Sequence, residues 1–421
     1  RKGFRKPYSR TQALNPSHSF IVQAPAGSGK THLLTLRLLT LLSQVQHPQE
    51  IIAITFTKKS AHEMLERLIN YLKTTKHEEP ALQRLCEMVR HKDQKNNWGL
   101  QSAAPPLHIM TFDALAKTYL DSDVELINQI AHHIVNSGGK KLRPILMFYC
   151  KNLFSNMDKE LENKLNKMAV AIEFIHTATL LHDDVVDESA MRRSQPTANS
   201  LFGNAASVLA GDFLYSRAFQ IMTDVGSTEI MSIMANTTNK IAEGEVLQLM
   251  HCNNPEVSEE EYLKVIYYKT AMLFRASCAI PAILSNQTPE IIDTCKNFGG
   301  HIGTAFQLTD DLLDYSGTER EIGKRLGDDL REGKATLPLI RLMSTGDKNT
   351  TSLLKGTILE PDGAPFDQIV CLIKGSDAID YTKEKALYEC DSAKACLERF
   401  KENNAKKELM ELISFIHKRK G

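Results

Sequence analysis

The sequence predicts a mainly all-α protein that is preceded by a shorter α/β segment. From about residue 121 onward, apolar residues recur at helical spacing and no convincing strand pattern is present. Before that point, short β-branched runs alternate with helical patterns, which is typical of an α/β fold. The charge divides at the same place, because residues 1–120 carry 17 basic and 8 acidic residues whereas residues 121–421 carry 34 and 43. We therefore expect two unrelated units, 1–120 and 121–421.

The composition is that of a globular protein, since 42% of the 421 residues are hydrophobic and 24% are charged. No run of 18 apolar residues occurs, so no transmembrane helix is expected. The N-terminal residues lack the apolar stretch of a signal peptide. The eight cysteines form no CxxC pair. We interpret them as reduced thiols of a cytoplasmic protein and not as a disulfide framework or a zinc site.

The first segment contains three predicted strands and two predicted helices. The strands are expected at 19–23, 51–57 and 107–111, and the helices at about 32–43 and 58–73. Residues 90–106 are polar and contain prolines, which favours a loop.

A phosphate-binding loop follows the first predicted strand and precedes a helix, which is the context that such a loop requires. It reads Ala24-Pro25-Ala26-Gly27-Ser28-Gly29-Lys30-Thr31, with Ala in place of the usual first Gly. The candidate ATP-binding residues are Gly27, Ser28, Gly29, Lys30 and Thr31. Backbone N–H groups would cradle the phosphates, Lys30 would meet the β- and γ-phosphates, and Thr31 would bind magnesium.

The second segment predicts a bundle of about ten helices. They are expected near 123–137, 143–154, 160–188, 203–224, 227–251, 259–286, 288–316, 335–343, 367–373 and 378–418. Residues 345–365 contain several glycines and prolines and are expected to form the main late loop.

The same aspartate motif occurs twice in the helical segment. The copies are Asp183-Asp184-Val185-Val186-Asp187 and Asp310-Asp311-Leu312-Leu313-Asp314. Positions i and i+4 of a helix share a face, so Asp183 and Asp187 point the same way. Crowded carboxylates beside apolar residues repel each other and resist burial, and a hard divalent cation relieves both effects. Magnesium takes one or two carboxylates together with waters and phosphate oxygens. The six aspartates are therefore candidate catalytic residues that clamp a diphosphate through Mg²⁺.

Glycines and basic residues near the clusters also indicate phosphate binding. The stretch Gly138-Gly139-Lys140-Lys141-Leu142-Arg143-Pro144 places two glycines and a basic group at a helix start, where anions are favoured. Further polar residues follow or precede the aspartates, namely Arg192, Arg193, Lys269, Thr270, Gln307, Lys324 and Lys334.

Together these motifs resemble the trans-polyprenyl diphosphate synthase family over about residues 121–421. The stretch from Ile175 to Ser189 is similar to the first aspartate-rich motif of that family, and Phe306 to Asp314 is similar to the second. The pairs Gly211-Asp212 and Gly244-Glu245 match internal family motifs. The resemblance implies an isoprenoid-synthase helical bundle that binds two or three Mg²⁺ ions and condenses isopentenyl diphosphate with an allylic diphosphate, for which farnesyl diphosphate is expected.

The resemblance also implies roles for individual residues. The implied metal ligands are Asp183, Asp187 and Asp310. The implied isopentenyl diphosphate ligands are Lys140, Arg143, His176 and Arg193. The implied allylic diphosphate ligands are Arg192, Lys269, Thr270, Gln307 and Lys324. His176 also lies seven residues before Asp183 and shares its helical face. The family further implies a homodimer and a product that is delivered to the membrane as a precursor of quinone side chains.

The length of the product is partly readable from the residues before the first cluster. Ala178 and Thr179 lie five and four residues before Asp183. In the resembled family, bulky aromatic residues here block the tunnel for the growing chain and small ones leave it open. The small residues therefore predict a long all-trans product, and the resemblance implies a length of about eight isoprene units, C40.

The first segment resembles the opening of superfamily 1 DNA helicases of the UvrD/RecB type over about residues 10–118. The resemblance rests on the phosphate loop and on the stretches 54–64 and 111–115. No Walker B strand ending in Asp-Glu and no later helicase motif follows, so ATP hydrolysis is not expected. We expect a truncated helicase-like fragment with a vestigial ATP site and without nucleic-acid binding. Two alternatives stay open: a DNA-dependent ATPase, and a catalytically inactive subunit that binds prenyl diphosphates.

Overall fold

The computed structural model describes residues 30–55, 58–102, 105–154, 158–192, 195–316 and 327–417. The chain divides into two compact units, Arg1–Asp121 and Ser122–Gly421. Each unit has its own core. No helix in the described part of the chain is long and apolar enough to cross a membrane.

The first unit combines helices with two parallel strands. Its elements are α2 (Lys30–Leu42), the 3₁₀ turn η1 (Pro48–Glu50), β1 (Ile52–Thr55), α3 (Lys58–Lys73), α4 (Pro80–Asn96), β2 (His108–Thr111) and α5 (Phe112–Lys117). Strands β1 and β2 pair in parallel, with Ile52 opposite His108. The predicted strand 19–23 and the residues Gly27, Ser28 and Gly29 of the phosphate loop lie outside the described residues, and so do the side chains of Lys30 and Thr31.

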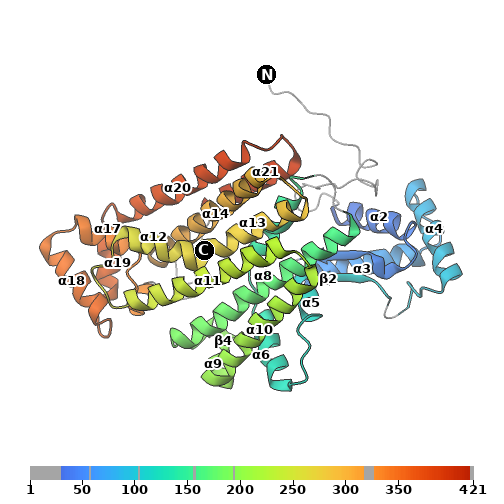
Figure 1. Ribbon diagram of the computed structural model, residues 1–421. Coiled ribbons are helices and arrows are strands. Elements are labelled where there is room, and N and C mark those ends of the chain that lie inside the picture. Colours follow the sequence, from blue (N-terminus) through green and yellow to red (C-terminus); the bar gives the residue numbers. More distant parts are fainter. Residues whose placement is uncertain are drawn as a thin grey trace. The chain divides into compact units, whose positions relative to one another are not determined.

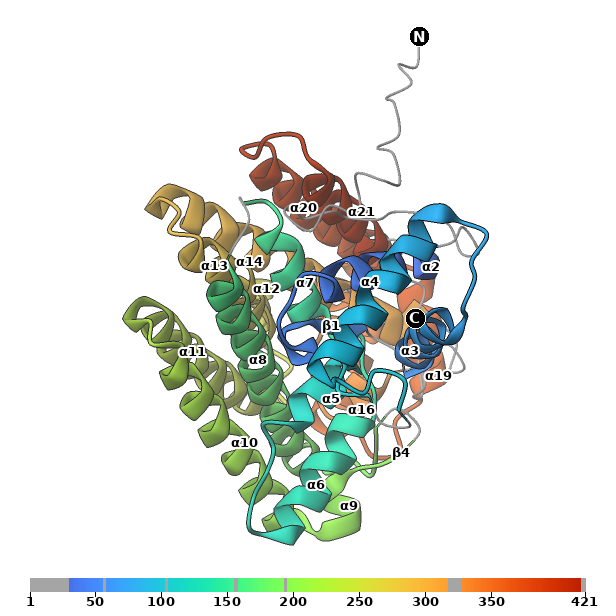
Figure 2. The same cartoon turned by 90° about the vertical axis from the view of Figure 1, so that its right-hand side faces the viewer.

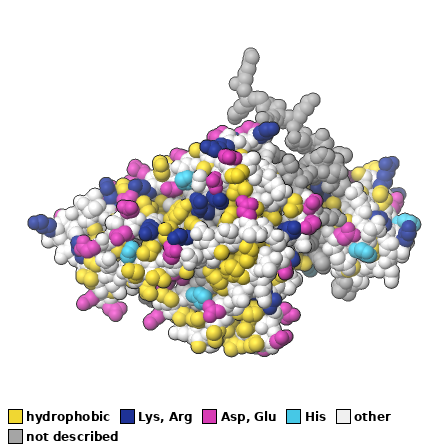
Figure 3. All heavy atoms as spheres, viewed as in Figure 1, with side chains coloured by type: hydrophobic (Ala, Val, Ile, Leu, Met, Phe, Trp, Pro, Cys, Tyr) yellow, Lys and Arg dark blue, Asp and Glu magenta, His cyan; other side chains and the backbone are white. Residues whose placement is uncertain are grey.

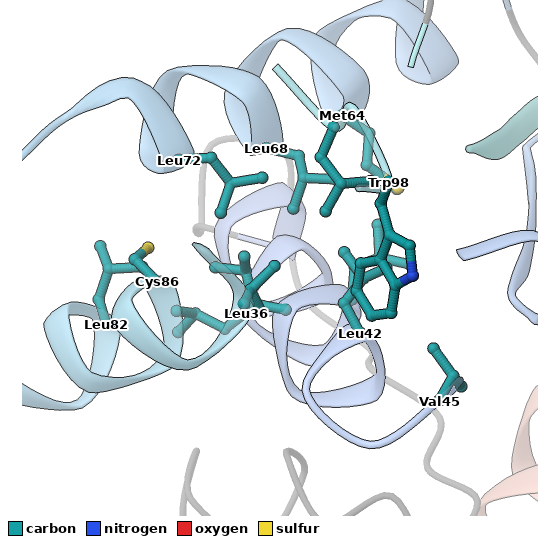
Figure 4. Packing of buried hydrophobic residues seen from close by; sticks show 13 residues of the cluster. Leu36, Leu42, Val45, Met64, Leu68, Leu72, Leu82, Cys86 and Trp98 are labelled. Atoms are coloured by element: carbon teal, nitrogen blue, oxygen red, sulfur yellow. The ribbon is translucent and has the colours of Figure 1, made fainter. Parts of the chain in front are cut away.

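An apolar core fills the space between α2, α3 and α4. Leu42, Leu68, Leu72 and Cys86 are almost completely buried there, and Figure 4 shows Trp98 at one side of the cluster and Cys86 at the other. The indole Nε1 of Trp98 donates a hydrogen bond to the carbonyl of Gln46, which satisfies its polar end.

Helix α4 corrects the prediction of a loop over 90–106, because residues 90–96 are helical. Pro80 occupies the first helical turn, where its missing N–H is no loss. The helix ends at Asn97, which adopts a left-handed conformation with φ 52°. Asp93 is buried and accepts a hydrogen bond from the backbone N–H of Leu100. This hydrogen bond satisfies a polar side chain within the apolar core.

The second unit is a helical bundle. Its elements are α6 (Glu125–Asn136), α7 (Leu142–Lys151), α8 (Lys159–Val186), β3 (Met191–Arg192), β4 (Gln195–Pro196), α9 (Ala198–Phe202), α10 (Asn204–Val225), α11 (Thr228–His251), α12 (Glu259–Ile266), the π-helical turn η2 (Tyr267–Ala271), α13 (Met272–Leu284), α14 (Pro289–Ser316), α16 (Asp328–Arg331), α17 (Leu337–Thr345), α18 (Lys348–Leu359), α19 (Phe366–Lys374), α20 (Ala378–Leu397) and α21 (Asn404–His417). The expected all-α bundle is confirmed.

Three long helices, α8, α13 and α14, position the site. Helix α8 packs along α10, and α14 packs between α13 and α20 (Figures 1 and 2). Phe174 and Ile175 of α8 and Phe274 of α13 are fully buried in this bundle. Because both aspartate clusters lie near the C-terminal ends of long, well-packed helices, their backbone positions are held by the core.

Glycines let helices α13 and α14 approach each other closely. A methyl group at Gly299 of α14 would overlap the backbone carbonyl of Phe274, and one at Gly303 would lie 2.6 Å from the Cα atom of Ala271. A side chain at either position would push the helices apart. Gly244 of α11 makes a similar contact, because a methyl group there would lie 2.7 Å from the backbone nitrogen of Lys269.

Three other predictions need correction. The expected loop 345–365 contains α18, which the side chain of Asp347 caps and which buries Leu354 and Ile358. The single helix expected at 378–418 is broken into α20 and α21. A short antiparallel hairpin, β3–β4, occurs in the segment where no strand was expected. The loop was predicted partly because of Gly356, but this glycine is an exposed residue within helix α18.

Replacement of Gly299 by Ala is predicted to lower the stability of the second unit by about 1–3 kcal/mol, because the new methyl group meets backbone atoms. Gly356→Ala is the matched control: a methyl group there meets nothing within 4 Å, and an exposed helical Gly→Ala change adds about 0.5–1 kcal/mol of stability. Thermal unfolding followed by circular dichroism checks both. Equal behaviour of the two variants would contradict the tight packing of α13 on α14.

Candidate active site

The first aspartate cluster lies at the C-terminal end of α8. Asp184 is completely buried, whereas the side chains of Asp183 and Asp187 are 16% and 21% exposed. Carboxylates are disfavoured at this end of a helix, where the backbone carbonyls already concentrate negative charge. The cluster is therefore stable only with positive charge beside it.

Each carboxylate of this cluster contacts a different cation. Lys269 Nζ lies 3.4 Å from Asp183 Oδ1. Arg192 Nη2 lies 2.7 Å from Asp184 Oδ1, and Lys334 Nζ lies 2.9 Å from Asp187 Oδ2. The three cations come from η2, from β3 and from the segment after α16. Residues that are far apart in the sequence are thus gathered at one helix end.

Lys269 is held by more than one partner. Its Nζ contacts Glu245 Oε2 at 2.6 Å and donates to Gln248 Oε1 at 2.7 Å, both on α11. Burial lowers the pKa of Lys269, but the charges of Asp183 and Glu245 outweigh it and the pKa lies above its usual value. The pKa of Glu245 is raised to about 7, first by burial and then by Asp183, with Lys269 opposing both. Lys269 is therefore charged and fixed in place.

Lys334 resembles Lys269 in its surroundings. It contacts Asp187 and also Glu332, whose Oε2 lies 2.7 Å from Nζ. Burial lowers the pKa of Lys334, and these two carboxylates raise it by more, so that the ammonium stays charged.

The second cluster lies near the C-terminal end of α14 and has one exposed and two buried members. Asp310 is exposed, and Asp311 and Asp314 are buried. Tyr262 donates its hydroxyl to Asp311 Oδ2 at 2.6 Å, and Gln307 donates its amide to Asp311 Oδ1 at 2.7 Å. Asp314 accepts a hydrogen bond from the backbone N–H of Asp329. Burial, with a contribution from Asp329, raises the pKa of Asp311 to about 8.

The π-helical turn η2 connects the two clusters. Its residues Lys269 and Thr270 are consecutive: Lys269 reaches Asp183, and the hydroxyl of Thr270 donates to Gln307 Oε1 at 2.9 Å. Gln307 in turn holds Asp311. A π-helical turn inserts an extra residue into a helix and often occurs at functional sites. Here it carries the two neighbouring side chains that link the clusters.

Two of the four predicted isopentenyl diphosphate ligands, Lys140 and Arg143, lie at the start of α7. Lys140 is exposed and immediately precedes Lys141, the N-cap residue of α7. The guanidinium carbon of Arg143 lies 4.5 Å from the centre of the Phe274 ring. His176 lies on α8 and is half-buried. Arg193 and the allylic ligand Lys324 lie outside the described residues.

The predicted chain-length positions lie on α8 just before the first cluster. Ala178 is fully buried. Thr179 is half-buried, and its hydroxyl donates to the carbonyl of His176 at 2.8 Å, so that the polar group is turned back onto the helix. The surface that these two residues offer to neighbouring groups is small.

Several residues of the site were not predicted as site residues. Glu332, Glu245 and Tyr262 contact the clusters or their cations. Lys334 was expected near a phosphate but received no particular role, and the structure places it on Asp187. Tyr262 gave no signal, because a tyrosine on an amphipathic helix is ordinary.

Over the described ranges, no three His, Cys, Asp or Glu side chains converge on one point that would hold a metal ion. The more exposed carboxylates of the two clusters are those of Asp183, Asp187 and Asp310, and carboxylate oxygens suit Mg²⁺. The fold and this site define a helical bundle with two aspartate clusters, the first of which has basic residues held against it.

Comparison with known proteins gives the same class. The sequence model of the polyprenyl synthetase family matches residues 124–367. An octaprenyl diphosphate synthase of Escherichia coli is 46% identical over 280 residues, which cover 66% of this chain and 85% of that protein. An octaprenyl diphosphate synthase of Haemophilus influenzae is 43% identical over 312 residues, which cover 74% and 93%. A polyprenyl synthase structure from Caulobacter crescentus, complexed with calcium and isoprenyl diphosphate, is 39% identical with a TM-score of 0.70 and covers 74% of this chain and 94% of that one.

The chain therefore belongs to the polyprenyl synthetase family, and its enzymatic class is that of a trans-polyprenyl diphosphate synthase. A second sequence model, of an AAA domain, matches residues 10–206 and so overlaps the first match. This match includes the phosphate loop, which lies almost wholly outside the described residues.

Asp311→Asn is predicted to stabilise the protein at high pH when no divalent cation is present. Folded Asp311 keeps its proton up to about pH 8, whereas an unfolded Asp loses it near pH 4, so rising pH favours the unfolded chain across this window. The variant lacks this dependence, so its free energy of unfolding is expected to rise relative to that of the wild type by on the order of 4 kcal/mol between pH 5 and pH 8. Chemical denaturation in EDTA at both pH values checks it. If the difference in unfolding free energy between the variant and the wild type is the same at both pH values, Asp311 has an ordinary pKa.

Proposed function

We propose that this protein condenses isopentenyl diphosphate with an allylic diphosphate, in a Mg²⁺-dependent reaction, to make an all-trans polyprenyl diphosphate of about eight isoprene units. One observation carries the proposal: η2 links the two clusters, because its Lys269 contacts Asp183 and its Thr270 donates to Gln307, which holds the buried Asp311 of the second cluster. A diphosphate held at this point would meet carboxylate-bound metal and fixed cations together.

Mg²⁺ fits the donor set, which consists of carboxylates that are only partly exposed and would complete their coordination with diphosphate oxygens. When bound, it supplies positive charge that neutralises the leaving diphosphate as the allylic C–O bond breaks. The metal ligands by resemblance are Asp183, Asp187 and Asp310. All three are the more exposed members of their clusters.

The side chains of the protein then have separable tasks. Arg192 and Lys269, which contact Asp184 and Asp183, supply donors for the allylic diphosphate, and Thr270 and Gln307 extend this side of the site. Their fixed positions cost no reorganisation when charge develops. Lys140, Arg143 and His176 would orient isopentenyl diphosphate so that its double bond attacks the allylic carbon. A proton is then lost from the new C5 unit, and pyrophosphate leaves.

The small surface of Ala178 and Thr179 supports a long product. Both residues lie on α8 one turn before Asp183, where the growing chain would leave the reacting centre. With the Thr179 hydroxyl bonded to the His176 carbonyl, neither residue projects a bulky group. Two relatives above 40% identity that carry the name octaprenyl diphosphate synthase support a length near C40.

Elongation by the full chain tests the proposal. Labelled isopentenyl diphosphate, farnesyl diphosphate and Mg²⁺ are expected to give products that end near C40. Thr179→Phe is expected to shorten the product by several isoprene units, because a phenyl ring fills the path, whereas Thr223→Phe on the exposed end of α10 is the control and leaves the length unchanged. Absence of elongation by folded wild-type protein would contradict the function. An unchanged length in Thr179→Phe would contradict the tunnel assignment.

A homodimer through α10 and α11 is part of the proposal. These helices are joined by the turn at Gly226. Both carry exposed apolar side chains, namely Val208 and Leu209 on α10 and Val246, Leu249 and Met250 on α11. Figure 3 shows hydrophobic side chains gathered over the region where Figure 1 places α9, α10 and α11. An exposed apolar patch of this kind marks an interaction site, and a second copy of the chain is the occupant that the family implies.

Leu209→Glu is predicted to convert the dimer to a monomer, because a charge would be buried in the interface. Leu387→Glu, at an exposed leucine of α20, is the control and should leave the dimer intact. The molar mass from light scattering distinguishes them. A monomeric wild type, or a Leu209→Glu variant with the mass of the dimer, would exclude this interface.

A further inference from the structure

The start of α7 concentrates positive charge where a helix tolerates it least. Lys140, Lys141 and Arg143 surround its first turn, and no acidic residue lies in that turn. The N-terminal end of a helix carries partial positive charge, so three cations there repel it and one another. A carboxylate from a different helix must offset part of this repulsion if the turn is to keep its shape.

Glu173 of α8 is placed to do so. Its Oε1 lies 2.9 Å from Lys141 Nζ, and the two side chains are only 6% and 8% exposed. Lys141 is also the residue whose backbone turns the chain into α7, in a left-handed conformation with φ 48°. The side chain of Lys141 makes no capping hydrogen bond. Its ion pair with Glu173 therefore anchors a strained residue between Lys140 and Arg143.

Two buried polar atoms at this ion pair lack hydrogen-bond partners among the described residues. These atoms are Glu173 Oε2 and Arg143 Nε. The Arg143 guanidinium lies against the Phe274 ring. Burial lowers the pKa of Arg143 to about 10, and the charge of Glu173 opposes this. The negative charge of Glu173 thus acts on Arg143 as well as on Lys141.

We propose that Glu173 is a positioning residue for the isopentenyl diphosphate site: through its buried ion pair with Lys141 it fixes the turn that presents Lys140 and Arg143. The inference rests on the proposed function and deepens it. Glu173 does not touch the substrate. It lies one helical turn before His176 on α8, so the same helix carries a substrate ligand and the anchor of the others.

The sign of the effect separates positioning from simple electrostatics. If Glu173 only lowered the positive potential, its neutralisation would tighten the binding of a diphosphate. If it positions the turn, neutralisation loosens the turn and weakens binding, although the net charge becomes more favourable. Glu173→Gln keeps the size of the side chain and removes only the charge, so it tests this difference directly.

The dissociation constant of isopentenyl diphosphate, measured by calorimetry on the full chain, is expected to rise about tenfold in Glu173→Gln. The constant for farnesyl diphosphate is expected to stay within about twofold, because that site is held by other residues. In the elongation assay, KM for isopentenyl diphosphate should rise by more than kcat falls. Unchanged or tighter binding of isopentenyl diphosphate would overturn the proposal.

Glu162→Gln is the matched control, since Glu162 Oε1 lies 2.8 Å from Lys151 Nζ and this ion pair also joins α8 to α7, near the other end of α7. It should leave both dissociation constants unchanged. Lys141→Met should weaken isopentenyl diphosphate binding as Glu173→Gln does. It replaces Glu173→Gln in the test if Glu173→Gln does not fold. The double variant should be no weaker than either single one, because both remove the same ion pair. Fully additive losses would contradict an action of Glu173 through Lys141.

If the wild type binds both diphosphates but does not elongate them, this result would count against the proposed function alone. The binding comparison between wild type and Glu173→Gln would still decide the role of Glu173.

Discussion

The site depends on the compensation of carboxylates that gather at the ends of two helices. Asp183, Asp184 and Asp187 occupy the end of α8, where the helix itself opposes negative charge. In this structure Lys269, Arg192 and Lys334 each contact one of them. Without the aspartates, the cations in turn would repel one another. The negative and the positive charges of the site therefore stabilise each other.

The packing of the bundle serves this arrangement. Lys269 reaches Asp183 because η2 lies close against α11 at Gly244, and Thr270 reaches Gln307 because α13 and α14 touch at Gly299 and Gly303. A larger residue at these positions would separate the helices and lengthen the contacts on both sides of η2. The geometry of the site is thus set by small residues that carry no chemistry themselves.

The sequence was sufficient to predict the features that depend on local pattern. The helical bundle, the boundaries of α3 and the position of the first aspartate cluster at the end of a helix follow from periodicity and spacing; the helix itself ends at Val186, and Asp187 is its C-cap residue. Helices α4 and α18 were missed because their exposed polar residues and Gly356 resemble a loop, while a few buried residues such as Leu354 decide the structure. Contacts between distant segments could not be predicted. The contacts of Tyr262 with Asp311 and of Glu173 with Lys141 depend on how helices pack, and nothing in their local sequence reports them. The sequence marked Lys334 as a basic residue near the second cluster, but not its contact with Asp187 of the first.

The central claim of the proposed function is that a diphosphate is bound jointly by Mg²⁺ on the aspartates and by the cations fixed beside them. The most direct test is a calorimetric titration of the full chain with inorganic diphosphate, with and without Mg²⁺, corrected for the Mg²⁺–diphosphate complex that forms in solution. The account predicts that Mg²⁺ tightens diphosphate binding at least about tenfold, and that Asp183→Asn removes this coupling. Equal affinity with and without Mg²⁺ in the wild type, or full coupling in Asp183→Asn, would contradict it.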